Sequence, residues 1–452
     1  MSVLNPDLQF HSLDYRPHLA NELFEPIEHL PWAMLLRSAS DHHIDSRFDI
    51  LVAEPTATIV TQGSMSSVTQ PTGCSSYDGD PFEIIESLSE QYCPHLTLDV
   101  DLPFVGGALG YFSYDLGRRV EKIPTLAEKD LSSPDMAIGI YDWAVIVDHQ
   151  LKQATLIAPN TQHRLLWLQS HVAKPTPPFE RTSDWQANMT KQEYSEKFAV
   201  IHEYLLSGDC YQINLAQRWR ASYQGNEWHA YQQLEEVNGA PFSAFIRLDN
   251  SAIISISPER FIQLKSQTIE TKPIKGTRPR HPNPELDIQQ AQALARAEKD
   301  QAENLMIVDL LRNDIGRVAK PGTVHVPHLF EIESFPAVHH LVSTIRAELD
   351  EQFSPSQLLR ACFPGGSITG APKIRAMEII EELEPHRRSA YCGSIGYISR
   401  HGRMDTSITI RTLVAENGYI HAWAGGGIVA DSECNSEYQE TYDKLSRILP
   451  VL

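Results

Sequence analysis

The sequence predicts a large globular protein that combines strands and helices, because two kinds of hydrophobic periodicity occur along it. Apolar residues recur at every second position in segments such as 253–269, which is typical of strands. In other segments, such as 190–208, they recur at every third or fourth position, which is typical of helices. The chain has 452 residues, of which 42% are hydrophobic and 21% are charged. Such a chain can bury a large core, and its length allows about three domains or one large unit.

The charge balance limits the classes of partner. The net charge is −20, from 58 acidic and 38 basic residues, which argues against general nucleic-acid binding and favours a soluble protein. An anionic substrate is still compatible with this charge, because a metal ion and a few basic side chains can reverse the electrostatic field in one cleft.

Cysteine usage and the N-terminus both point to the cytoplasm. The six cysteines include no Cys-x-x-Cys pair and are too sparse for a disulfide framework, so reduced thiols are expected. Residues 1–5 contain no basic stretch followed by an apolar one, and no apolar run approaches the roughly 20 residues of a membrane span. We therefore expect a cytoplasmic protein without a signal peptide.

The first 170 residues combine strands and helices. Two strands are predicted at 31–36 and 46–53, joined by a polar loop that begins at Ser38. This loop is either an ordinary connection or the wall of a small-molecule pocket. The Gly-rich segment 106–111 lacks the spacing of a nucleotide-binding loop and is assigned to packing, and 137–147 is predicted as one or two buried strands.

A Pro-rich segment, 174–179, is the best candidate for a boundary between regions. After it, Thr190 begins a helix with a capping box, and Gly208 ends that helix. A strand predicted over 210–218 then places Gln212 on a polar face that can line a cleft.

The stretch Lys272–Arg278 is the first candidate for chemistry. It follows alternating strands, and Gly276 lets the backbone approach a ligand closely because it has no Cβ. Lys275, if partly desolvated at the mouth of a sheet, can act as a neutral amine nucleophile. The alternative is a solvated lysine in a surface turn, and the local sequence does not decide between the two.

Carboxylates beside apolar residues are the second candidate. A helix without internal Gly or Pro is predicted over 286–313, and it places Glu303 one turn before Ile307. Glu303 is therefore either a solvated side chain or part of a buried or metal site. The segment 364–373 is a Gly-rich loop before another helix, where an anion can bind, but it is not a Walker A motif.

The C-terminal segment contributes two more strands. One is predicted over 404–413 and carries Arg411 on one face. The second, over 422–429, contains Gly425, Gly426 and Gly427, whose backbone amides can reach a carboxylate.

The final helix is predicted over 435–449 and has two faces. Its apolar stripe consists of Tyr438, Tyr442, Leu445 and Leu449. Another face carries Glu437, Glu440 and Lys444. Two carboxylates one turn apart beside a lysine suit a hard cation with an anionic ligand, and the alternative is a solvated Glu–Lys ladder.

Taken in order, these motifs resemble the chorismate-utilising enzymes, which include anthranilate synthases, aminodeoxychorismate synthases, isochorismate synthases and salicylate synthases. The resemblance is strongest over 190–452 and continues more loosely to the N-terminus. The motifs that carry it are Ser257-Pro258-Glu259-Arg260-Phe261, Pro273–Thr277, Ala302–Leu310, His340-Leu341, Pro364–Lys373, Asp405–Arg411, Gly425–Ile428 and Glu437-x-x-Glu440-x-x-x-Lys444.

The resemblance implies a fold like that of anthranilate synthase component I. This is one α+β unit of four layers, α/β/β/α, in which two large β-sheets face each other with helices outside. It also implies an N-terminal region, 1–180, and a chorismate-binding catalytic region, 181–452, that form one integrated unit.

The resemblance further implies magnesium-dependent chemistry on chorismate. Glu303, Glu437 and Glu440 match the carboxylates that hold Mg²⁺ against the ring carboxylate of the substrate. Glu259 matches the general acid that protonates the hydroxyl leaving ring carbon 4.

Two positions select the reaction within the family. Lys275 is typical of aminodeoxychorismate synthases, where the lysine attacks ring carbon 2 and ammonia then adds at carbon 4 and expels it. Anthranilate synthases typically carry alanine there. Isochorismate and salicylate synthases carry a lysine in place of Gln212 to activate water. The pair Lys275 and Gln212 thus resembles component I of aminodeoxychorismate synthases, which act in the 4-aminobenzoate branch of folate synthesis.

Substrate and partner contacts follow from the same resemblance. The two carboxylates of chorismate would be held by Gly276, Thr277, His340, Tyr391, Arg411, Gly425, Gly426, Gly427 and Lys444. The chain contains no visible glutaminase nucleophile motif, so a separate glutaminase subunit, component II, is expected to supply ammonia.

An N-terminal pocket resembles the tryptophan site of the family. Its residues would be Ser38, Asp45, Ser46, Arg47, Phe48, Pro241, Phe242 and Ser243. Two other functions are therefore considered: an anthranilate synthase component I, and a catalytically silent tryptophan-binding regulatory protein. The presence of Glu259, Glu303 and Glu440 argues against the silent protein.

Overall fold

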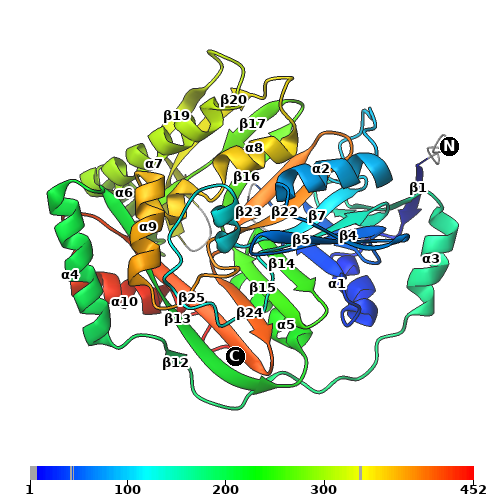
Figure 1. Cartoon of the computed structure of the whole chain (residues 1–452), viewed down its shortest axis with the longest axis horizontal. Coiled ribbons are helices and arrows are strands. Elements are labelled where there is room, and N and C mark those ends of the chain that lie inside the picture. Colours follow the sequence, from blue (N-terminus) through cyan, green and yellow to red (C-terminus); the bar gives the residue numbers. More distant parts are fainter. Residues whose placement is uncertain (1–7, 41–42, 44, 335–337) are drawn as a thin grey trace.

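The computed structural model describes residues 8–40, 43, 45–334 and 338–452, and it confirms the predicted α+β class. Two large antiparallel β-sheets face each other, and helices lie on their outer sides (Figure 1). The N-terminal residues 1–5, in which no signal peptide is predicted, lie outside the described residues.

The first sheet contains thirteen of the described strands. Its order is β1 (Gln9–Leu13), β10 (Gln153–Ala158), β9 (Ala144–Asp148), β3 (Phe48–Val52), β2 (Met34–Arg37), β14 (Phe242–Arg247), β15 (Ser251–Ser257), β24 (Thr412–Glu416), β25 (Tyr419–Ile428), β13 (Gln212–Gln224) and β11 (Glu180–Arg181). Two short strands also pair with β13, namely β12 (Gln186–Ala187) and β21 (Gly370–Ala371).

The second sheet contains twelve of the described strands. Its order is β18 (Ile274–Pro279), β20 (Val338–Glu348), β17 (Thr268–Thr271), β16 (Arg260–Lys265), β23 (Met404–Ile408), β22 (Ser394–Ser399), β7 (Gly107–Phe112), β8 (Met136–Tyr141), β4 (Ala57–Gln62), β5 (Met65–Gln70) and β6 (Gly73–Tyr77), and β19 (His325–Ser334) pairs with β20. Strands from both sides of the segment 174–179 lie in each sheet. The division into 1–180 and 181–452 stays a prediction.

The helices form the outer layers. Those that pack on the first sheet are α1 (Leu19–Phe24), α3 (Thr161–Ser170), α4 (Lys191–Ser207), α5 (Glu227–Asn238), α9 (Lys373–Leu383) and α10 (Cys434–Leu445). Those that pack on the second sheet or beside it are α2 (Pro81–Tyr92), α6 (Pro284–Ala295), α7 (Glu298–Gly316) and α8 (Pro355–Cys362). Three 3₁₀ turns complete the set, η1 (Glu25–Ile27), η2 (Tyr114–Arg119) and η3 (Gly366–Ile368).

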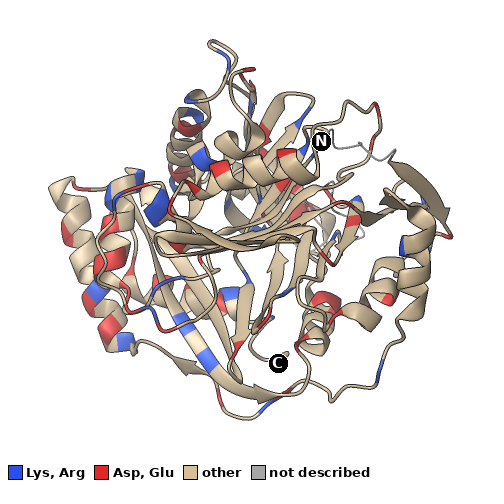
Figure 2. Ribbon diagram, turned by 45° about the vertical axis from the view of Figure 1, so that its right-hand side comes forward, with Lys and Arg blue, Asp and Glu red and all other residues tan. Residues whose placement is uncertain are grey.

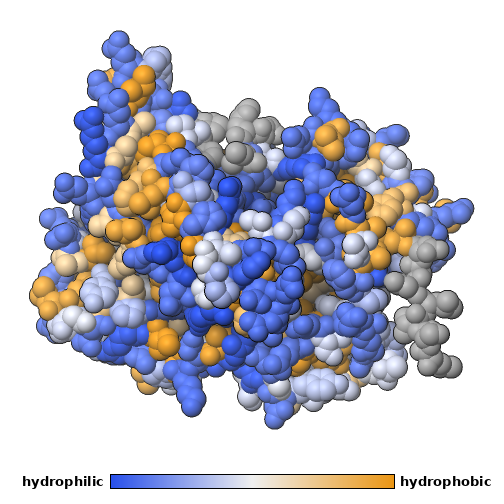
Figure 3. All heavy atoms as spheres, turned by 90° about the horizontal axis from the view of Figure 1, so that it is seen from above, coloured by the Kyte–Doolittle hydropathy of each residue, from blue (hydrophilic) through white to orange (hydrophobic). Residues whose placement is uncertain are grey.

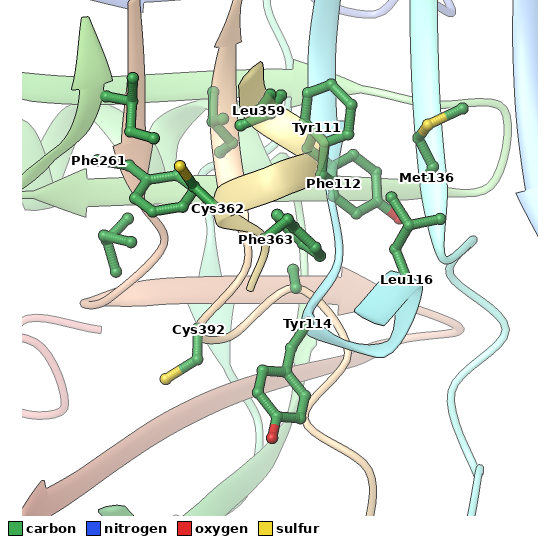
Figure 4. Packing of buried hydrophobic residues seen from close by; sticks show 14 of the residues in the cluster. Tyr111, Phe112, Tyr114, Leu116, Met136, Phe261, Leu359, Cys362, Phe363 and Cys392 are labelled. Atoms are coloured by element: carbon green, nitrogen blue, oxygen red, sulfur yellow. The ribbon is translucent and has the colours of Figure 1, made fainter. Parts of the chain in front are cut away.

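Strand alternation divides the core into two layers. In β2, Met34 faces the core that extends between the sheets, while its neighbour Leu35 faces the core under the helices of the first sheet. Phe112 of β7 and Phe363, which follows α8, approach with ring centroids 6.3 Å apart in the core between the sheets. Figure 4 shows Phe363 between Phe112 and Phe261.

Two predicted elements are interrupted in the structure. The helix predicted over 286–313 is the pair α6 and α7, because the chain turns at Arg296 and the Gln301 side chain donates to the Ala295 carbonyl at 2.6 Å. The strand predicted over 404–413 breaks after Ile408, and Arg411 has a φ of 50°. The residues after the break form β24, so the chain passes from the second sheet to the first at this point.

The final helix ends earlier and buries a different face than predicted. It ends at Leu445, and its buried residues are Glu437, Thr441 and Leu445. Tyr442 is 36% exposed, whereas Glu437 is only 5% exposed. The glycines of β25 explain the difference, because they leave room for a carboxylate against the strand.

The surface agrees with the charge analysis. Figure 2 shows acidic and basic positions interleaved along the outer helices instead of gathered on one basic face. The face in Figure 3 is mostly hydrophilic, with apolar residues in separate patches. In the part of the chain that the structure describes, no helix combines the length and the apolar character needed to cross a membrane.

Candidate active site

The candidate site lies between the two sheets and draws residues from both. Lys275 belongs to β18 of the second sheet, and Gln212 belongs to β13 of the first. Helix α7 contributes Glu303, and helix α10 contributes Glu437 and Glu440. Residues that are far apart in the sequence therefore meet at one place.

A bulge in β18 presents Lys275. The strand pairs Lys275 with Leu341 and Thr277 with His340, which leaves Gly276 outside the regular register. Gly276 has a φ of 70°, and a Cβ there would lie 2.8 Å from the Asp300 Cγ. The position therefore requires glycine both for its backbone conformation and for space.

The Lys275 amine is held by a carboxylate. Its Nζ lies 2.8 Å from Glu303 Oε1 and 3.4 Å from the Ser367 carbonyl oxygen. The Gln212 amide donates to the same Glu303 oxygen at 2.5 Å. Burial acts to raise the pKa of Glu303, but Lys275 and Gln212 outweigh it and hold that pKa below its usual range. The structure thus contains a paired lysine, whereas a solvated one was the alternative reading.

Glu259 is a buried carboxyl next to this pair. It follows β15 and is 8% exposed, and the Ser367 hydroxyl donates to its Oε1 at 3.1 Å. Burial raises the pKa of Glu259, although Lys275, Ser367 and Lys444 oppose the shift. A carboxyl with a raised pKa keeps its proton at higher pH, as a general acid requires.

Three carboxylates approach the glycines of β25. A Cβ at Gly426 would lie 3.0 Å from Glu437 Oε2 and 3.4 Å from Glu440 Oε1, and one at Gly427 would lie 2.9 Å from Glu303 Oε1. Burial raises the pKa of Glu437, and the neighbouring Glu440 raises it further, against a hydrogen bond from Ser432. Carboxylate oxygens that face a glycine cradle and repel each other form a donor set that fits a hard cation such as Mg²⁺.

These carboxylates are not yet gathered as metal ligands. Among the described residues, no three acidic, histidine or cysteine side chains are grouped closely enough to hold a metal ion. Glu303 is paired with Lys275, and Glu440 is paired with Lys444 at 2.7 Å. To bind a cation, Glu303 and Glu440 would have to leave Lys275 and Lys444 and coordinate the cation instead.

Basic and polar groups line the adjoining cavity, which has a volume of about 1220 Å³. Thr277, His340, Arg411 and Lys444 are among its lining residues. No hydrogen bond or ion pair joins the Arg411 guanidinium to another residue that the structure describes. Burial, with the help of Arg411, lowers the pKa of His340 to about 4, so this ring is neutral and Thr277 lies 2.9 Å from its Nδ1. An uncommitted guanidinium in a cavity suits a carboxylate ligand.

The glycines of β25 have an open edge towards the same region. Strand β24 pairs with β25 only over Tyr419–Ala422, so β13 is the described strand that pairs with Gly425, Gly426 and Gly427. Lys444 donates to the Gly425 carbonyl at 2.7 Å. Tyr391, in contrast, is buried and stacks on Trp423 with ring centroids 6.2 Å apart.

The residues predicted for the tryptophan pocket are divided in space. Those that line a small cavity of about 80 Å³ are Ser38, Asp45, Phe48, Pro241, Phe242 and Ser243. Ser46 lines the larger cavity instead. Arg47 pairs with Asp148 at 2.8 Å and with Asp101 at 2.7 Å, and it is not among the described residues that line either cavity.

Sequence reasoning assigned no role to Ser367 or Arg260. Ser367 contacts both Lys275 and Glu259, and its place in the Gly-rich loop was the available signal. Arg260 pairs with Asp45 at 2.6 Å and with Asp405 at 2.9 Å beside the small cavity. Its signal was its position directly after Glu259 in the motif.

Comparison with known proteins places these features in one family. The family model described as chorismate binding enzyme matches residues 34–450. Aminodeoxychorismate synthase component 1 of Escherichia coli (strain K12) is 58% identical over 453 residues, which covers 100% of both chains.

Solved structures agree with this relation. Anthranilate synthase component I of Streptococcus pneumoniae TIGR4 superposes with a TM-score of 0.79 at 30% identity, covering 90% of this chain and 93% of that one. The menaquinone-specific isochorismate synthase of Escherichia coli has the same fold, with a TM-score of 0.74 at 16% identity over 99% of this chain and 95% of that one. The two facing sheets are thus those of a known architecture. With the family model matched over residues 34–450, the chain belongs to the chorismate-binding enzyme family.

Proposed function

We propose that this chain is component 1 of an aminodeoxychorismate synthase. It would convert chorismate and ammonia into 4-amino-4-deoxychorismate, for the 4-aminobenzoate branch of folate synthesis. The observation that carries the proposal is the position of Lys275, whose amine lies 2.8 Å from Glu303 and 3.4 Å from the Ser367 carbonyl. The high identity to the Escherichia coli relative over the full chain supports it.

The cavity residues would bind the substrate. Arg411 and Lys444 supply positive charge, and the Thr277 hydroxyl and the open edge at Gly425, Gly426 and Gly427 supply hydrogen-bond donors for the two carboxylates. With Gly276, His340 and Tyr391, these residues remain our proposed substrate contacts. The ring would then lie with carbon 2 towards Lys275 and the carbon 4 hydroxyl towards Glu259.

Lys275 and Glu259 would carry out the first half of the reaction. Lys275 loses its proton to solvent and leaves Glu303. Its neutral amine then attacks ring carbon 2, while both conjugated ring double bonds shift towards carbon 4. The carbon 4 hydroxyl departs as water with the proton of Glu259. The products of this half are a covalent Lys275 adduct and an ionised Glu259.

Ammonia completes the reaction. It attacks carbon 4, both ring double bonds shift back, and the bond between carbon 2 and Lys275 breaks to release the neutral amine. The new ammonium group returns one proton to Glu259, which resets the acid. Lys275 thereby directs nitrogen to carbon 4, because carbon 2 is occupied when ammonia adds.

Glu303, Glu437 and Glu440 would hold a magnesium ion beside β25. When bound, Mg²⁺ supplies charge neutralisation for the ring carboxylate and withdraws electron density from the ring. The approach of these carboxylates to Gly426 and Gly427, and the raised pKa of Glu437, support this assignment.

A separate glutaminase subunit in the cytoplasm would supply the ammonia. The name of the Escherichia coli relative, component 1, supports a partner component. The small cavity beside Ser38, Asp45 and Ser243 would take tryptophan, and its mixture of apolar and polar lining residues supports an amino acid with a large side chain.

One incubation tests the function. The pure chain receives chorismate, Mg²⁺ and an ammonium salt, and the products are separated by chromatography. We expect 4-amino-4-deoxychorismate, and mass spectrometry of protein quenched without ammonia should detect the adduct on Lys275. Direct release of fluorescent anthranilate would instead assign the chain to the anthranilate synthases. Absence of any product would favour a silent tryptophan-binding protein.

A further inference from the structure

A fully buried ion pair lies behind the candidate site. Glu384 follows α9, and Arg388 lies four residues later in the non-helical segment after that helix. The guanidinium donates to Glu384 through Nε at 2.9 Å and through Nη2 at 2.7 Å. The Arg388 side chain is 1% exposed, and that of Glu384 is 5% exposed. Desolvation makes such a pair weak support for stability, because apolar residues of similar size can serve as well.

The pair also binds the main chain of two other elements. Arg388 Nη1 donates to the Ile368 carbonyl of η3 at 2.9 Å, and Nη2 donates to the Asn214 carbonyl of β13 at 2.7 Å. Glu384 accepts from the Ala216 amide of β13 at 2.8 Å. The planar fork of an arginine can reach several acceptors at fixed angles, which a lysine cannot do.

Both of these elements, η3 and β13, carry a residue that contacts Lys275 or its partner Glu303. Ser367, directly before Ile368, contacts Lys275 through its carbonyl and Glu259 through its hydroxyl. Gln212, two residues before Asn214 on the same strand face, donates to the Glu303 oxygen that also pairs with Lys275. Ser367 and Gln212 thus contact the Lys275–Glu303 pair from the two elements that Arg388 joins.

We propose that Arg388, held by Glu384, is a positioning residue that fixes the spacing between η3 and β13 and so places Lys275 between Ser367 and Glu303. This inference rests on the proposed function of Lys275. Arg388 is not among the described residues that line the cavity, and its guanidinium carbon lies 4.8 Å from the ring centroid of Tyr114 and 5.8 Å from that of Tyr391. Figure 4 shows Tyr114 at one end of the drawn part of the apolar cluster.

The first test compares Arg388→Lys with Arg247→Lys. Arg247 is the control, because its guanidinium also binds both a main-chain carbonyl, that of Glu28 at 3.0 Å, and carboxylates, Glu28 at 3.1 Å and Glu227 at 3.0 Å. It lies over Phe245, on the helix-covered side of the first sheet. The measurement is the pH dependence of kcat with ammonium as nitrogen donor. At high pH, kcat should fall with an apparent pKa, and we call this fall the alkaline limb. Its position on the pH axis does not depend on the fraction of active protein, so a general loss of folding does not move it.

The expected result follows from the surroundings of Glu259. The groups that act on it are Lys275, Lys444 and the Ser367 hydroxyl, each of which lowers its pKa. In Arg388→Lys, η3 shifts and the Ser367 hydrogen bond weakens, so the alkaline limb moves up by about one pH unit. We also expect kcat to fall on the order of 10- to 100-fold, because small displacements at a reacting centre are costly. Arg247→Lys should leave the limb in place.

A second variant keeps the inference testable if Arg388→Lys does not fold. Glu384→Asp retains both charges but moves the carboxylate back by one methylene, and it should shift the limb in the same direction. An unshifted limb in either folded variant would overturn the proposal, and so would failure of both variants to fold, since the pair would then serve folding. If the unmodified chain itself forms no aminodeoxychorismate, the proposed function fails instead.

Discussion

Two cavities open between the same pair of sheets, yet their charged groups are arranged in opposite ways. Around the small cavity, Arg260 lies 2.6 Å from Asp45 and 2.9 Å from Asp405, and Gln263 also donates to Asp405 at 2.9 Å. Its charges are therefore neutralised within the protein. In the large cavity Arg411 has no side-chain partner among the described residues. Burial raises the pKa of the nearby acids Glu259 and Glu437, as it does that of Asp405, but Asp405 has an arginine partner that opposes the shift and these two acids do not.

This difference separates a region that maintains its shape from one prepared for a charged ligand. A compensated ion-pair network is stable without a ligand, and removal of one member leaves the others buried and uncompensated. Uncompensated charges are costly in the free protein, but an anion and a cation can each recover that cost on binding. Changes in the first region should affect folding, and changes in the second should affect catalysis.

Lys275→Ala should produce the largest effect on catalysis. Without the amine no covalent adduct can form, and we expect the rate of aminodeoxychorismate formation to fall on the order of 10³-fold or more, as for other nucleophile deletions. The measurement is the initial rate with chorismate and ammonium. Lys272→Ala is the control from the same stretch, because Lys272 pairs with Glu333 and not with Glu303. A variant that kept most of its rate would exclude the covalent route.

Arg260→Met should instead destabilise the fold. It leaves the partly buried Asp45 and Asp405 without their cation, and because both carboxylates keep some solvent contact the free energy of unfolding should fall by about 3 kcal/mol, the lower end of the range for buried pairs. Chemical denaturation with urea measures this quantity. Arg312→Met is the control, since Arg312 forms an exposed pair with Asp309, and it should change stability by less than about 0.5 kcal/mol. Equal effects of the two substitutions would remove the distinction between the cavities.

The sequence predicted the class of fold and most of the residues that meet in the site. Its motifs contain Glu259, Lys275, Glu303 and Glu440, and strand and helix periodicity located most elements. It failed at Arg411, because alternation continues through 404–413 and only the tertiary structure shows the chain changing sheets there.

Burial of carboxylates was equally hard to predict. The sequence places Tyr438 and Tyr442 on the apolar stripe of the last helix, yet Glu437 is the buried residue. The reason lies in another element, because the glycines of β25 create the space that Glu437 fills. For Arg388 the sequence offers only the spacing of four residues from Glu384, because its other acceptors are main-chain carbonyls of η3 and β13.

Glu259→Gln should lower the rate less than Lys275→Ala and should change its pH dependence. A general acid must be protonated, so the unmodified enzyme loses activity as pH rises through the pKa of Glu259, which burial raises above the usual carboxyl range. We expect a rate loss on the order of 10²-fold and disappearance of the alkaline limb due to this group. A pH series of kcat measures both. Asp45→Asn, from the compensated cavity, should retain the limb, and a limb that persisted in Glu259→Gln would assign the proton to another group.

Glu437→Gln should have the smallest effect, confined to the metal requirement. The substitution removes one charge from the carboxylates beside Gly426, so the magnesium concentration for half-maximal activity should rise on the order of 10-fold while kcat at saturating magnesium changes little.

Glu437 must be ionised to bind a cation, and its pKa is raised by burial and by Glu440. The magnesium requirement of the unmodified enzyme should therefore increase as pH falls, and this increase should be weaker in Glu437→Gln. Glu433→Gln, at the exposed start of the same helix, is the control that should leave the requirement unchanged. If both variants needed the same magnesium concentration as the unmodified chain, the raised pKa of Glu437 would reflect burial alone, and the contrast between the two cavities would rest on Arg411 and Glu259.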